Sequence, residues 1–108
     1  AYSSAKAALT MLVRQLAQEW ASDGIRTNMV APGLIETPLT ASVYADQALR
    51  RSRETAVPLG RIGRPDDVAS AIFFLASREA SYVTGQILAI DGGIADASLL
   101  RIPGLPKT

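Results

Sequence analysis

The sequence contains neither cysteine nor histidine among its 108 residues. Disulfides, thiolate nucleophiles and zinc sites built from cysteine and histidine are therefore excluded. Every catalytic triad that needs a histidine is excluded as well. No metal site is expected, and any acid–base chemistry must fall to tyrosine, lysine, aspartate or glutamate.

The sequence also lacks a large excess of either charge, because 11 basic and 10 acidic residues leave a formal net charge of +1. The chain has no basic stripe for nucleic acid and no polybasic run for an anionic membrane. Its longest apolar runs, such as residues 71–76, are far shorter than the roughly 20 residues that span a bilayer. We therefore expect a cytoplasmic protein whose partner is a small molecule.

Periodicity and turn signals divide the chain into a few elements. Apolar residues recur at helical spacing between Ala5 and Trp20, and Gly24 suits the left-handed position after a helix end. Pro65 can open a helix whose first turn is acidic. The expected elements are a helix over 3–22, a strand over 25–31, a helix from Pro65 and a strand over 86–90.

The order of strand, crossover helix and strand is that of a βαβ unit with parallel strands. Two parallel strands are too few for a sheet that is normally covered on both faces. We therefore expect residues 1–108 to form a single partial domain. Residues 37–57 are polar and weakly periodic, which favours a loose helix and a substrate lid. The tail, 94–108, shows no periodicity.

Tyr2 and Lys6 are four residues apart, so a helix that includes Tyr2 would place both side chains on one face. A free phenol has a pKa near 10, and a neighbouring ammonium group lowers it. Such a tyrosine could protonate the alkoxide that forms when a carbonyl accepts hydride. The Tyr2–Lys6 pair alone does not establish a catalytic function, because an exposed helix can carry these residues without any function.

Further motifs follow the pair in a fixed order. They are YSSAK at 2–6, IRTNMVAPGLIET at 25–37, RIGRPDDVA at 61–69, TGQ at 84–86 and DGG at 91–93. Over residues 1–93 this series resembles the C-terminal half of a short-chain dehydrogenase/reductase. The resemblance implies an α/β fold, the C-terminal part of a Rossmann-like doubly wound parallel sheet.

The resemblance also implies roles for single residues. Tyr2 matches the family's catalytic acid/base, and Lys6 matches the lysine that lowers its pKa and binds the nicotinamide ribose. The family's catalytic serine, helix asparagine and glycine-rich phosphate loop lie upstream of the tyrosine and are absent here. The chain is therefore expected to be a fragment that is inactive alone and exposes apolar surface.

The implied cofactor is NAD or NADP, bound at the loop after the first strand. Pro32 and Gly33 match that loop, at the strand end where open α/β sheets bind cofactors. In the family, backbone groups at the position of Ile35 hold the nicotinamide carboxamide, and Thr37 contacts the carboxamide or the pyrophosphate. Arg26 and Asn28 are interpreted as strand-end structure.

The resulting prediction is an NAD(P)-dependent oxidoreductase acting on a secondary alcohol or ketone, similar to 3-oxoacyl reductases or to sugar and polyol dehydrogenases. The intact protein is expected to be a homo-oligomer, a dimer or tetramer. One alternative is an epimerase or dehydratase of the extended branch of the superfamily. Another is a non-catalytic self-association module of the same fold, which would bind no nicotinamide cofactor.

Overall fold

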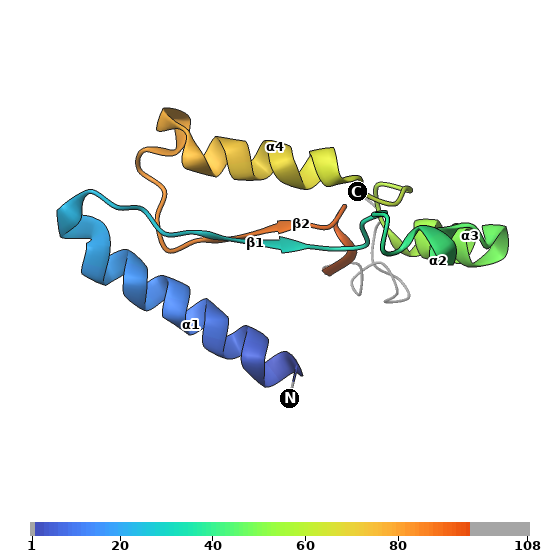
Figure 1. The fold of residues 1–108 in the computed structure, drawn as a ribbon, viewed down its shortest axis with the longest axis horizontal. Coiled ribbons are helices and arrows are strands. Elements are labelled where there is room, and N and C mark those ends of the chain that lie inside the picture. Colours follow the sequence, from blue (N-terminus) through green and yellow to red (C-terminus); the bar gives the residue numbers. More distant parts are fainter. Residues whose placement is uncertain (1, 96–108) are drawn as a thin grey trace, which may run out of the picture. The chain divides into compact units, whose positions relative to one another are not determined.

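The computed structural model describes residues 2–95, so most of the predicted tail lies outside the described residues. Its main elements are α1 (Tyr2–Trp20), β1 (Met29–Pro32), α2 (Ala41–Tyr44), α3 (Gln47–Ala56), α4 (Pro65–Ala76) and β2 (Ile87–Ile90) (Figure 1). Short 3-10 helices span Ala21–Asp23 and Arg78–Ala80. Within residues 2–95, no helix is both long and apolar enough to cross a membrane.

The described residues divide into two compact units. The first contains residues 2–31 and 69–89, and the second contains residues 32–68 and 90–95. The first holds α1, and the second holds α2 and α3.

The first helix ends almost where its sequence predicts. Helical backbone runs from Tyr2 to Trp20 and tightens into a 3-10 turn, after which Gly24 adopts a left-handed φ of 75°. The Gly24 N–H donates to the Ala21 carbonyl at 3.0 Å, and the Ile25 N–H donates to the Trp20 carbonyl at 3.2 Å. These bonds satisfy carbonyls at the helix end, and the glycine adopts this φ without a Cβ penalty.

The first strand is shorter than expected, because β1 begins at Met29 rather than at residue 25. Side chains instead take up backbone groups in the preceding residues. The Thr27 N–H donates to the Thr84 hydroxyl at 3.1 Å, and the Asn28 Oδ1 accepts from the Gln86 N–H at 3.0 Å. The chain is thus held beside the second strand before the regular ladder starts.

The two strands pair in parallel. The Met29 N–H donates to the Gln86 carbonyl at 2.9 Å, and the Gly33 N–H donates to the Ile90 carbonyl at 3.0 Å. Both partners advance by four residues in the same direction, which defines a parallel register. In the first unit, Figure 1 shows these strands between α1 and α4. The predicted α/β organisation is confirmed.

Arg26 closes the C-terminal end of α4. Its guanidinium donates to the carbonyls of Leu75, Ser77 and Val83 at 2.7, 3.1 and 3.2 Å. Asn28 adds a bond from its amide nitrogen to the Val83 carbonyl at 3.0 Å. A cation at a helix C-terminus satisfies orphan carbonyls and complements the helix dipole, so the structural interpretation of Arg26 and Asn28 is confirmed.

Each unit has a small core and much exposed apolar surface. Val13, Ala17 and Ala80 are buried in the first unit, and Tyr44, Val57 and Ile62 are buried in the second. In contrast, Met11 on α1 is 62% exposed and Phe73 on α4 is 77% exposed. The expectation that the chain exposes apolar surface is confirmed.

Candidate functional site

The helical backbone of α1 begins at Tyr2, so one helical turn separates Tyr2 from Lys6. Residues four apart on a helix share a face. Thr10 lies one turn further along, and its hydroxyl donates to the Lys6 carbonyl at 3.0 Å. The structure thus meets the backbone condition on which the predicted acid–base pair depends.

The cofactor positions predicted from the sequence lie at and after the end of β1, in the second unit. Pro32 is the last residue of β1. A Cβ added at Gly33 would lie 2.6 Å from the Asp91 Cβ and 2.8 Å from the Asp91 Cα. Glycine at position 33 is therefore explained by the close approach of the two chain segments, apart from any ligand.

Ile35 forms an isolated parallel bridge with Gly63. The Gly63 N–H donates to the Leu34 carbonyl, and the Glu36 N–H donates to the Gly63 carbonyl, both at 2.9 Å. In this pattern the N–H and C=O of Ile35 itself face away from Gly63. The Ile35 carbonyl accepts from the Thr40 hydroxyl at 3.0 Å, whereas no residue of the described part accepts from the Ile35 N–H.

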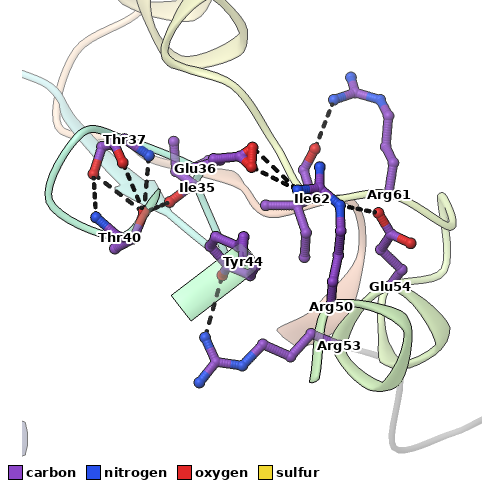
Figure 2. A network of polar contacts seen from close by, with 10 residues as sticks. All are labelled: Ile35, Glu36, Thr37, Thr40, Tyr44, Arg50, Arg53, Glu54, Arg61 and Ile62. Atoms are coloured by element: carbon purple, nitrogen blue, oxygen red, sulfur yellow. Dashed lines mark hydrogen bonds and ion pairs between the residues drawn. The ribbon is translucent and has the colours of Figure 1, made fainter. Parts of the chain in front are cut away.

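A compact turn holds Thr37. Its N–H donates to the Thr40 hydroxyl at 2.8 Å, and the two threonine hydroxyls lie 3.2 Å apart. The Thr40 N–H donates back to the Thr37 carbonyl at 3.0 Å. One hydroxyl, that of Thr40, thus connects Ile35 to Thr37 (Figure 2).

Glu36, between these two residues, forms an ion pair with α3. Arg50 Nη1 lies 2.6 Å from Glu36 Oε1, and Arg50 Nε lies 3.1 Å from Glu54 Oε1 (Figure 2). The hydrogen bond to Glu36 is the largest cause that raises the pKa of Arg50, and Glu54 adds to it. The Arg50 guanidinium therefore joins the loop after β1 to the helix that follows.

The predicted lid segment is more regular and better anchored than its sequence suggests. It forms two helices, and Asp46 caps the second by accepting from the N–H groups of Ala48 and Leu49 at 3.0 and 3.2 Å. Tyr44 is only 2% exposed, and its hydroxyl accepts from Arg53 Nη1 at 3.3 Å. The sequence predicted one loose helix here, whereas the structure has two helices that a buried ring and specific polar contacts anchor.

A further ion pair stabilises the start of α4. Arg61 donates through both terminal nitrogens to Asp67, at 2.8 and 2.9 Å, and the Arg64 N–H donates to Asp67 Oδ2 at 2.7 Å. The Arg61 hydrogen bonds are the largest cause holding the pKa of Asp67 well below its ordinary value, and the Arg64 N–H is the next. As a carboxylate, Asp67 thus accepts from both the Arg61 guanidinium and the Arg64 N–H at the start of α4.

Replacing Asp67 with asparagine is expected to destabilise the protein at pH 7, and the loss should shrink as the pH falls. A carboxylate whose folded pKa is lowered contributes stability above its unfolded pKa, near 3.9, and loses it toward its folded pKa. Urea unfolding at pH 7 and pH 3 measures this. Asp66→Asn, an exposed neighbour in the same turn, is the control. Equal losses for both variants would contradict the assignment.

Sequence reasoning identified Ile35 and Thr37 but missed the residues that hold them, which are Glu36, Thr40 and Arg50. The spacing of Arg50 and Glu54 is a signal for a helical ion pair. Nothing local, however, indicates that Arg50 also reaches Glu36, which is 14 residues away. The structure brings Pro32, Gly33, Ile35 and Thr37 together in the second unit, whereas Tyr2 and Lys6 belong to the first.

Comparisons with known proteins are consistent with this α/β arrangement. Residues 1–95 match the family model described as enoyl-(acyl carrier protein) reductase. A tropinone reductase homolog of Arabidopsis thaliana is 50% identical over 93 residues, which are 86% of this chain and 35% of that protein.

Two solved structures are also similar. The complex of 4-hydroxyisoleucine dehydrogenase with NADH matches with a TM-score of 0.82 and 36% identity, over 88% of this chain and 39% of that one. The complex of RhlG from Pseudomonas aeruginosa with NADP matches with a TM-score of 0.78 and 35% identity, over 86% and 38%.

The parallel strands and the loop at the end of β1 define a Rossmann-like α/β protein. The chain belongs to the short-chain dehydrogenase/reductase family. It spans little more than a third of the length of the relatives that it matches.

Proposed function

We propose that the full-length gene product containing these residues is an NAD(P)-dependent oxidoreductase that interconverts a secondary alcohol and a ketone. The observation that carries this proposal is the Ile35 N–H, a main-chain donor that no described residue satisfies, at the carboxyl end of a parallel strand. Open α/β sheets bind their ligands at this end of the strands.

The residues present fit a nicotinamide carboxamide. Such a group offers a carbonyl acceptor and an NH₂ with two donors, while Ile35 offers an N–H that no described residue accepts and a carbonyl with a second lone pair beside the bond from Thr40. The Thr37 hydroxyl lies two residues further on and can add a polar contact. When bound, the nicotinamide supplies or accepts the hydride, and this loop orients it.

Tyr2 and Lys6 are proposed as the acid–base pair. The role of Tyr2 is to give a proton to the substrate oxygen during reduction, or to take it during oxidation. Lys6 favours the phenolate by its positive charge and also binds the nicotinamide ribose. Their spacing of one turn on α1 supports this assignment.

The proposed substrate class is a small alcohol or ketone, of the 3-oxoacyl or the sugar and polyol type. Two of the similar proteins are named as a tropinone reductase homolog and as 4-hydroxyisoleucine dehydrogenase. Residues 37–57 are proposed to cover the substrate. Their helix α3 is joined by Arg50 to the loop that would hold the cofactor.

A second candidate is a module that self-associates without turnover. Such a module would use the exposed apolar side chains of Met11, Leu12 and Phe73. They are equally compatible with an enzyme that works as a homodimer or homotetramer. Cofactor binding separates the two candidates, because only the enzyme binds a nicotinamide dinucleotide.

The proposed function is tested by titrating the full-length gene product with NADH, NADPH and ADP-ribose while amide hydrogen exchange is followed. We expect NADH or NADPH to slow exchange at Ile35 and between residues 39 and 57. ADP-ribose, which lacks the nicotinamide ring, should leave Ile35 unprotected. A protein that binds neither reduced dinucleotide would refute the oxidoreductase and favour the self-association module.

A further inference from the structure

The loop from Ile35 to Thr40 is held from two sides. On one side the Thr40 hydroxyl bonds to the Ile35 carbonyl and the Thr37 N–H. On the other side the only ion pair that the described residues provide for this loop joins Glu36 to Arg50 of α3. The first support is local in sequence, whereas the second depends on the position of a separate helix.

Glu36 connects helix α3 to the main chain of this loop. Its N–H is fixed by the Gly63 carbonyl at 2.9 Å, and both of its carboxylate oxygens lie within 3.3 Å of Arg50 Nη1. The two peptide groups that flank Glu36 belong to the segment that also carries Ile35 and Thr37. The Glu36–Arg50 ion pair therefore ties this stretch of main chain to α3.

Arg50 is itself fixed on α3. Its Nε donates to Glu54 one turn further along, and its guanidinium carbon lies 5.9 Å from the centre of the Tyr44 ring. The side chains of Arg50 and Glu36 are only 31% and 33% exposed. A guanidinium that holds carboxylates through different nitrogens is directional in a way that an ammonium group is not.

We propose that Arg50 is a positioning residue for the cofactor, which acts through Glu36 to hold the Ile35–Thr37 main chain in the geometry that receives the nicotinamide carboxamide. This inference rests on the proposed oxidoreductase function. By linkage, a bound nicotinamide would stabilise the same ion pair and so hold α3 against this loop. The cofactor and the predicted lid would then be coupled through one arginine.

The test compares Arg50→Met, Arg50→Lys and Glu36→Gln with the wild-type full-length gene product. The control is Arg51→Met, which removes an exposed cation from the same helix but leaves the Glu36–Arg50–Glu54 network intact. For each protein, dissociation constants are measured for the reduced dinucleotide and for ADP-ribose. Amide exchange at Glu36 and Thr37 is measured without any nucleotide.

We expect Arg50→Met to weaken binding of the reduced dinucleotide by about tenfold, within the range of ordinary coupling between sites. ADP-ribose binding should be unchanged, because it does not use the carboxamide contact. Glu36 and Thr37 amides should exchange faster in the free variant. The double variant with Glu36→Gln should lose no more than Arg50→Met, since both remove the same contact.

Arg50→Lys keeps the charge and most of the aliphatic stem, so it should fold even if Arg50→Met does not. It should recover only part of the lost affinity, because one ammonium group lacks the planar fork that joins Glu36 and Glu54. Equal weakening of dinucleotide and ADP-ribose, or unchanged binding of both by both Arg50 variants, would overturn the inference. Either result would leave the proposed function standing, since the wild-type protein would still bind its dinucleotide.

Discussion

Replacing Tyr2 with phenylalanine in the full-length gene product is expected to reduce turnover by roughly 10² to 10⁴-fold, the usual contribution of a positioned acid or base. The substitution removes one hydroxyl and keeps the aromatic ring. Affinity for the reduced dinucleotide should therefore stay nearly unchanged. Steady-state kinetics for turnover and fluorescence titration for binding measure the two effects separately.

Lys6→Ala is the informative comparison for Tyr2→Phe. It should reduce both turnover and dinucleotide affinity, because Lys6 is proposed to favour the phenolate and to bind the ribose. The two variants therefore differ in their effect on binding rather than in their effect on catalysis. A Tyr2→Phe protein that keeps more than about a tenth of the wild-type activity would show that Tyr2 is not the acid/base, because an acid or base contributes at least about 10²-fold.

Gly33→Ala is expected to destabilise the protein by about 1–3 kcal/mol, the usual cost of overpacking. The new Cβ would lie 2.8 Å from the Asp91 Cα, so relief requires the two backbone segments to separate. That separation would lengthen the bond from the Gly33 N–H to the Ile90 carbonyl, which is 3.0 Å long. We also expect weaker dinucleotide binding, because Ile35 follows directly after this contact.

Gly63→Ala is a matched control for the packing argument. Its added Cβ would lie 2.6 Å from the Ile35 Cδ1, the end of a flexible side chain, whereas the nearest backbone atom, the Leu34 carbonyl oxygen, is 3.3 Å away. Neither glycine has a positive φ in this structure, so backbone strain does not distinguish them. Urea unfolding should show a clearly smaller loss for Gly63→Ala, and equal losses would refute the explanation by backbone contact.

The helices illustrate how far local sequence signals reach. The ends of α1 and the start of α4 agree with the sequence to within about two residues. Gly24 adopts the left-handed conformation expected of it, with a φ of 75°. These features depend on capping interactions between residues within a turn of one another, so the local sequence is enough to predict them.

The segment between residues 37 and 57 shows where such reasoning stops. Polar composition suggested a loose element, but Tyr44 is buried and Arg50 pairs with Glu36. Both features require side chains that are distant in sequence to meet, and neither leaves a periodic pattern. The first half of the predicted strand was wrong for the same reason, since Thr84 and Asn28 side chains replace ladder bonds there.

By itself the sequence determined the α/β class, the order of the first helix, the two strands and the helix from Pro65, and the residue types available for acid–base chemistry. It placed Tyr2 and Lys6 one turn apart, because helical spacing follows from the chain alone. Only the tertiary structure decided that the Ile35 N–H remains without an acceptor among the described residues, and that Arg50 holds the loop beside it. The physical reason is that a bridge to Gly63 and an ion pair across 14 residues exist only once distant segments have packed together.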